Sequence, residues 1–141
     1  MRTVFLVRHA NIDLPPTSND PDLNAAGRQR ADALATVLGA AGVGRIFTSE
    51  LRRTKQTVAP LASRLHLQPS VVPDPAVLAQ KVSSGSFGDA ILVAGHSNTV
   101  PKMIAALGAD ASNAAIGESE FDNLFVVTVA TAQARVVRLK Y

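Results

Sequence analysis

The sequence has no cysteine and no tryptophan. Without thiols the chain has no disulfide, no iron–sulfur ligand, no thiolate zinc site and no cysteine nucleophile. No apolar run approaches the roughly 20 residues that cross a bilayer, and the first residues show no signal-peptide pattern. These absences predict a cytoplasmic protein with no membrane contact, although a cleaved leader would leave no trace in this sequence.

Aromatic residues and long basic runs are also scarce. The chain has five Phe and one Tyr, and its longest Lys/Arg block is the pair Arg52-Arg53. Proteins that bind nucleic acid through their bases need aromatic stacking platforms, which these few residues do not supply. The formal charge of +3 therefore favours a small anionic substrate or an anionic group on a protein, and we predict no nucleic-acid partner.

Two apolar runs end in polar residues that a hydrophobic core would exclude. Thr3 to Val7 is a β-branched and apolar run followed by Arg8 and His9, and Ala90 to Gly95 is a continuous apolar run followed by His96. Parallel α/β sheets place their sites at the carboxyl ends of strands. The first junction alone fits a surface loop equally well, but its repetition predicts a site at one edge of a sheet.

The remaining pattern alternates strands with helices. Asn24 is a plausible N-cap for a helix that ends at Gly39 or Gly42, and Pro60 predicts a kink or break in a later helix. We predict one domain over residues 1–141, a three-layer α/β/α fold with a mostly parallel sheet and an antiparallel edge. Its further elements are expected at residues 45–49 (strand), 51–66 (helix), 68–73 (strand), 75–86 (helix), 100–107 (helix), and 124–130 and 134–139 (hairpin).

Arginine and histidine together at such an edge are suited to phosphate. Arginine binds phosphate oxygens through two parallel hydrogen bonds, and a neutral imidazole can attack phosphorus. A metal site is the alternative, but the chain has only three histidines, and Arg8 beside His9 would repel a cation. Arg52 and Arg53 oppose the helix dipole unless an anion binds nearby, although a solvated face is the simpler interpretation of the pair. We predict no metal and no cofactor.

Four blocks in this order make the chain similar to the histidine phosphatase superfamily, which includes phosphoglycerate mutase and small bacterial phosphohistidine phosphatases. The blocks are Leu6-Val7-Arg8-His9-Ala10, Leu23-Asn24-Ala25-Ala26-Gly27-Arg28, Thr48-Ser49-Glu50-Leu51-Arg52-Arg53-Thr54-Lys55-Gln56-Thr57 and Val93-Ala94-Gly95-His96-Ser97-Asn98. The chain further resembles the short branch, because it lacks room for the cap insertions of larger members. The resemblance implies a phosphoglycerate mutase-like fold.

The same resemblance implies roles for individual residues. His9 matches the nucleophile that takes the phosphoryl group, and Arg8 and Arg53 match its phosphate ligands. Arg53 is chosen over Arg52 because the family's arginine lies four residues after the serine of the block. His96 matches the second histidine. Ser97 stands where a glycine is common in the family, and its backbone N–H remains available to the phosphate. Asn11 stands where many short-branch relatives have Glu.

The acid that protonates the leaving group is not assigned by this pattern. Asp74 and Asp89 lie in the interval where larger relatives place it, and the late connection offers further carboxylates at Glu118, Glu120 and Asp122. For each of them a solvated surface position is the simpler interpretation. Without a dedicated acid, phosphohistidine and other labile phosphates are favoured as substrates, because imidazole leaves more easily than an alkoxide.

These observations predict a metal-independent phosphatase that works through a phosphohistidine at His9. Its substrate would be a phosphorylated protein histidine or a small phosphate compound. Two alternatives remain open, a phosphate-binding module without catalysis and a small-molecule phosphomutase. The sequence makes no prediction of the oligomeric state.

Overall fold

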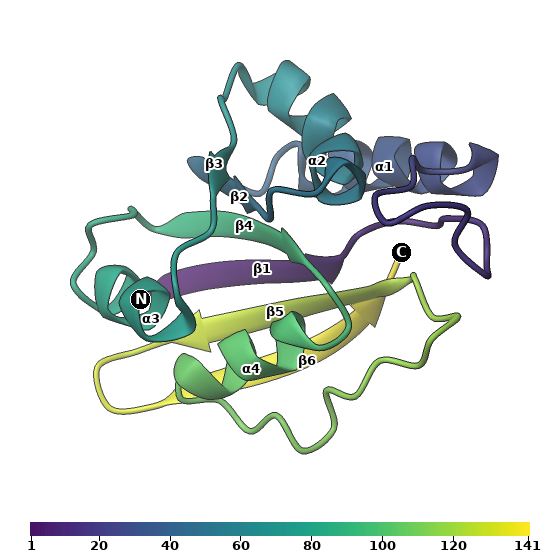
Figure 1. Ribbon diagram of the computed structural model, residues 1–141. Coiled ribbons are helices and arrows are strands. Elements are labelled where there is room, and N and C mark those ends of the chain that lie inside the picture. The colour runs from purple at the N-terminus through teal and green to yellow at the C-terminus, as the bar shows by residue number, and fades with distance from the viewer.

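The computed structural model describes residues 1–141, which form one six-stranded sheet with four helices (Figure 1). The helices and strands follow one another along the chain as β1 (Arg2–Arg8), α1 (Ala25–Leu38), β2 (Arg45–Thr48), α2 (Arg52–Leu65), β3 (Ser70–Val71), α3 (Pro75–Ser83), β4 (Ala90–Gly95), α4 (Thr99–Ala106), β5 (Asn123–Val129) and β6 (Ala134–Lys140).

The strands lie in the order β3-β2-β4-β1-β5-β6. The pairs β3–β2, β2–β4 and β4–β1 are parallel, whereas β5 runs antiparallel to both β1 and β6. The predicted mostly parallel sheet with an antiparallel edge is therefore confirmed. Arg8 pairs with Gly95 in the β1–β4 register, so the two strands end side by side, as their sequences predicted.

Two hydrophobic cores cover the two faces of the sheet. Because side chains alternate along a strand, Leu6 of β1 packs in the core beneath α3 and α4, and its neighbour Val7 packs in the core beneath α1 and α2. Helix α1 packs on α2 and α3 packs on α4, one pair on each side of the sheet (Figure 1). This arrangement is the predicted three-layer architecture.

The break predicted at Pro60 is absent, and the strand predicted over residues 68–73 is present but shorter than expected. Helix α2 continues through Pro60 without a break, and the missing N–H of this half-buried proline leaves only the Gln56 carbonyl without its helical partner. The strand expected over residues 68–73 is reduced to Ser70–Val71, because the prolines at 69 and 73 have no N–H for the ladder. No helix is both long and apolar enough to cross a membrane.

Two glycines allow close approaches near the ends of β1 and β4. A Cβ on Gly27 of α1 would lie 2.2 Å from the Asn11 carbonyl oxygen, and one on Gly95 would lie 2.8 Å from Thr99 Oγ1. Any larger residue would push α1 away from the segment that follows His9, or α4 away from the end of β4. Asn24 caps α1 as predicted, since its side chain accepts a hydrogen bond from the Gly27 N–H.

Candidate active site

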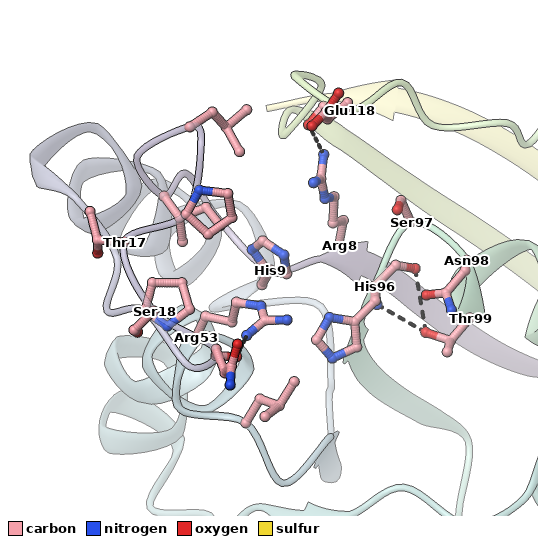
Figure 2. A pocket seen from close by; sticks show the side chains of 16 residues that line it. Arg8, His9, Thr17, Ser18, Arg53, His96, Ser97, Asn98, Thr99 and Glu118 are labelled. Carbon is pink, nitrogen blue, oxygen red and sulfur yellow. Dashed lines mark hydrogen bonds between the residues drawn. The ribbon is translucent and has the colours of Figure 1, made fainter.

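A cavity of about 880 Å³ opens at the carboxyl ends of β1 and β4 (Figure 2). Only three of its 16 lining residues are hydrophobic, so the cavity is built to bind a polar molecule. Its wall includes six of the candidate site residues that the sequence singled out: Arg8, His9, Arg53, His96, Ser97 and Glu118. The fold thus brings together side chains from β1, α2 and the segment after β4.

His9 is almost completely buried, with 3% of its surface exposed. Its Nδ1 lies 2.8 Å from the Ala10 carbonyl oxygen; a carbonyl can only accept, so the proton is on Nδ1 and Nε2 keeps its lone pair. Burial above all, then the charge of Arg8 and the neighbouring His96 and Arg53, lowers the pKa of His9 to about 4. His9 is therefore a neutral imidazole at pH 7 with a free nucleophilic nitrogen.

His96 lies beside His9, with 5.4 Å between the ring centroids. Its Nε2 is hydrogen-bonded to the Ser49 hydroxyl at 2.8 Å, and that hydroxyl lies 2.9 Å from Thr54 Oγ1. The backbone N–H of His96 donates to Thr99 Oγ1 (Figure 2). Burial, followed by Arg53 and Arg8, lowers the pKa of His96 to about 4. Both histidines are thus neutral at pH 7.

Arg8 is buried at the end of β1, and one end of its guanidinium is fixed by the late connection. Its Nη1 donates to three carbonyl oxygens in the segment 117–120, at 2.7 to 3.1 Å. The guanidinium carbon lies 4.2 Å from the centre of the Phe121 ring, a cation–π distance. Burial lowers the pKa of Arg8 and Arg53 lowers it further, whereas Glu118 raises it. The Nε of Arg8 is buried without a partner.

The two arginines at the start of α2 have different surroundings. Arg53 lines the cavity, with its Nη1 at 3.8 Å from an Asp20 carboxylate oxygen and 17% of its side chain exposed. Arg52 is 59% exposed, pairs with Asp22 and lies outside the cavity lining. Asp20 also accepts a hydrogen bond from the Arg52 backbone N–H at 2.9 Å, so this carboxylate satisfies part of the helix N-terminus.

Of the five candidate acids, neither Asp89 nor Asp122 is among the residues that line the cavity, and the other three lie in different places. Asp74 caps α3, where it accepts from the Ala76 N–H, and it is absent from the cavity lining. Glu120 accepts from the Gly117 N–H and lies 3.7 Å from Lys140 Nζ; it is also absent from the lining. Glu118 is the only carboxylate among the lining residues (Figure 2).

Asn11 has a structural partner outside the cavity. Its Oδ1 accepts a hydrogen bond from Arg30 Nε at 2.8 Å, and its backbone carbonyl accepts from Asn24. It is not among the lining residues. In this chain the position after Ala10 therefore ties the β1 end to α1.

Comparison with known protein families decides the relationship. A family model of the histidine phosphatase superfamily (branch 1) matches residues 4–77, a little over half of the chain. The chain belongs to this superfamily. The matched segment contains Arg8, His9 and Arg53 of the cavity, and His96 lies beyond it.

Curated relatives match part of their own length. A probable phosphatase of Schizosaccharomyces pombe is 34% identical over 91 residues, which are 61% of this chain and 41% of that protein. A PE-PGRS family protein of Mycobacterium tuberculosis is 43% identical over 70 residues, 49% of this chain and 11% of that protein. The chain thus spans less than half of the length of either relative.

Solved structures share the fold over nearly the whole chain. The protein histidine phosphatase SixA, solved with tungstate, superposes with a TM-score of 0.77 at 18% identity, covering 98% of this chain and 96% of that one. A mycobacterial glucosyl-3-phosphoglycerate phosphatase superposes with a TM-score of 0.75 at 18% identity, covering 100% and 98%. The phosphoglycerate mutase-like fold implied by the four sequence blocks is confirmed.

Three residues support the cavity-lining side chains and segments without a role predicted from the sequence. Ser49 holds His96, Thr57 Oγ1 accepts the Ala10 N–H at 2.8 Å, and Phe121 stacks on Arg8. Ser49 could have been found, because it follows directly after β2 in the same way that His9 and His96 follow their strands. Phe121 lies in an irregular connection with no period, so nothing in the sequence pointed to it.

Proposed function

We propose that this chain is a metal-independent phosphatase that forms a phosphohistidine at His9. One observation carries the proposal: a buried, neutral His9 with Nδ1 held by a carbonyl and Nε2 free, between two arginines. Two guanidinium groups supply the positive charge that a loose phosphoryl transition state needs on its equatorial oxygens.

The reaction has two steps. In the first, His9 Nε2 attacks phosphorus, an N–P bond forms, and the P–O or P–N bond to the leaving group breaks. In the second, the oxygen of a water molecule attacks the phosphorus, the N–P bond breaks, and inorganic phosphate and neutral His9 are regenerated. Arg8, Arg53, His96 and the Ser97 N–H hold the phosphoryl oxygens throughout.

Glu118, ionised before the substrate binds, is proposed to take the proton of the bound phosphate monoanion and pass it to the leaving group. It later takes a proton from the attacking water. Its position in the cavity lining supports this assignment, whereas Asp74 and Glu120 are bound to other partners. Glu118→Gln should therefore lower the hydrolysis rate of glycerol 3-phosphate, which has a poor leaving group, much more than the hydrolysis rate of p-nitrophenyl phosphate. Equal slowing of both substrates would contradict the assignment.

The decisive experiment measures turnover of p-nitrophenyl phosphate and of a phosphohistidine peptide with EDTA present, together with an acid-labile phosphoenzyme. Arg53→Ala should lose about a hundredfold to a thousandfold in rate. Arg52→Ala is the matched control, because the Arg52 side chain follows next to Arg53 in sequence but lies outside the cavity. The rate of this variant should remain within about twofold of wild type. No turnover and no phosphoenzyme would favour a non-catalytic phosphate-binding module.

A further inference from the structure

We infer that the substrate has one phosphate on an uncharged, hydroxyl-bearing body, and that Glu118 selects against a second anionic group. The inference rests on the proposed phosphatase function and narrows its substrate class. It follows from an inventory of the charges and hydrogen-bonding groups that line the cavity.

The cavity has few positive charges. Arg8 and Arg53 are the only lysine or arginine residues among its 16 lining residues, and the two histidines are neutral, each with a pKa of about 4. Both arginines lie next to the nucleophile, where the phosphate group of the substrate would occupy them (Figure 2). A carboxylate or second phosphate elsewhere on the substrate would lose its hydration without gaining a cationic partner.

The outer wall offers neutral hydrogen-bonding groups on two sides. Thr17 and Ser18 lie on the loop between β1 and α1, across the cavity from Ser97 and Asn98, which directly precede α4 (Figure 2). The Asn98 side chain does not cap α4, so its amide is available to a ligand. Hydroxyl and amide groups both donate and accept, which matches the hydroxyls of a polyol or sugar.

Glu118 gives the mouth its one negative charge. Its backbone carbonyl accepts from Arg8 Nη1 at 2.8 Å, which fixes the residue beside the phosphate site, and its side chain is solvent-exposed. A substrate carboxylate here would meet a like charge, whereas a hydroxyl could donate to the Glu118 carboxylate. Discrimination by such repulsion is a common way to reject a close analogue.

Two small phosphate esters test the inference. Glycerol 3-phosphate and 3-phosphoglycerate differ only in a terminal CH₂OH against a carboxylate, and both release a primary alkoxide. We expect wild-type kcat/KM to favour glycerol 3-phosphate by about tenfold or more at low salt. Glu118→Gln should reduce that ratio to about threefold or less, and Glu118→Lys should reverse the preference. Because both esters need the same proton transfer, its loss cancels in the ratio.

Asp32→Asn provides the control, since Asp32 is exposed on α1 away from the cavity, and it should leave the ratio unchanged. A wild-type ratio of one or less, or a ratio that Glu118→Gln leaves unaltered, overturns the inference while p-nitrophenyl phosphate turnover upholds the proposed function. Binding of the two esters to His9→Asn, measured by calorimetry, gives the same ranking test without turnover. Tighter binding of 3-phosphoglycerate would overturn the inference even if the proposed function failed.

Discussion

At the end of β1, His9 is fixed by the carbonyl of Ala10, one residue away, whereas at the end of β4, His96 is fixed by the hydroxyl of Ser49, 47 residues away. The two strands are parallel neighbours whose ends align, and both histidines have a pKa of about 4. Two histidines with similarly lowered pKa values are thus oriented by different hydrogen-bond partners, a backbone carbonyl for His9 and a side-chain hydroxyl for His96. Backbone support survives any change of the supporting side chain, and side-chain support does not.

Substituting His9 or His96 should have the largest effect on turnover, and the two substitutions should show that the histidines have different roles. His9→Asn should lower turnover more than about a thousandfold and abolish the acid-labile phosphoenzyme, because the nucleophile is gone. His96→Asn should cost about a hundredfold to a thousandfold but still form phosphoenzyme, since it removes one stabilising group. Rapid-quench trapping of phosphate on the protein distinguishes them.

His66 supplies the control for this comparison. It ends α2 with a left-handed backbone, φ 54°, which asparagine tolerates. His66→Asn should therefore keep wild-type turnover. If His9→Asn kept its phosphoenzyme while His96→Asn lost it, the assignment of the nucleophile would be reversed.

Removing the side-chain support of His96 should give an intermediate effect. Ser49→Ala deletes the hydroxyl that bonds His96 Nε2, so the imidazole loses its orienting partner, and we expect about a tenfold fall in kcat. Ser49→Thr keeps a hydroxyl and should restore most of the activity. A KM change alone, or no rescue by threonine, would contradict a positioning role.

The smallest expected effect is on pH dependence, where the two ends should behave alike. Each histidine is neutral in the folded protein down to about pH 4, but takes a proton near pH 6.5 in the unfolded chain. Between these values the unfolded state binds more protons, so the free energy of unfolding falls as pH decreases from 6.5 towards 4. The stabilisation is fully present above pH 6.5.

Urea unfolding at pH 7 and pH 5 measures this slope, and the slope should be smaller in His96→Asn. Imidazole signals followed by NMR give the two midpoints directly. Inorganic phosphate should raise both midpoints, because a bound dianion opposes the charges of Arg8 and Arg53. Midpoints near 6.5 in the free protein would show that the strand ends do not hold their histidines neutral.

Much of the site was readable from the sequence because it depends on local order. A strand that ends in Arg8-His9 and another that ends in His96 predict a shared edge whatever the loops do, since parallel strands align their carboxyl ends. Arg53 followed from its spacing to the serine in the block resembling the family. The prediction failed locally at Pro60, where packing of α2 on α1 and the sheet outweighs one lost hydrogen bond.

The sequence by itself placed Arg8, His9 and His96 at one edge of the sheet, because each of them stands at or directly after the end of a strand, and its resemblance to the family implied their roles. Only the tertiary structure decided what supports these side chains and which acidic residue lines the cavity. Arg8 is held by carbonyls 109 to 112 residues away, and Glu118 rather than Asp74 lines the cavity. Such contacts depend on the path of an irregular connection, for which the sequence has no periodic signal.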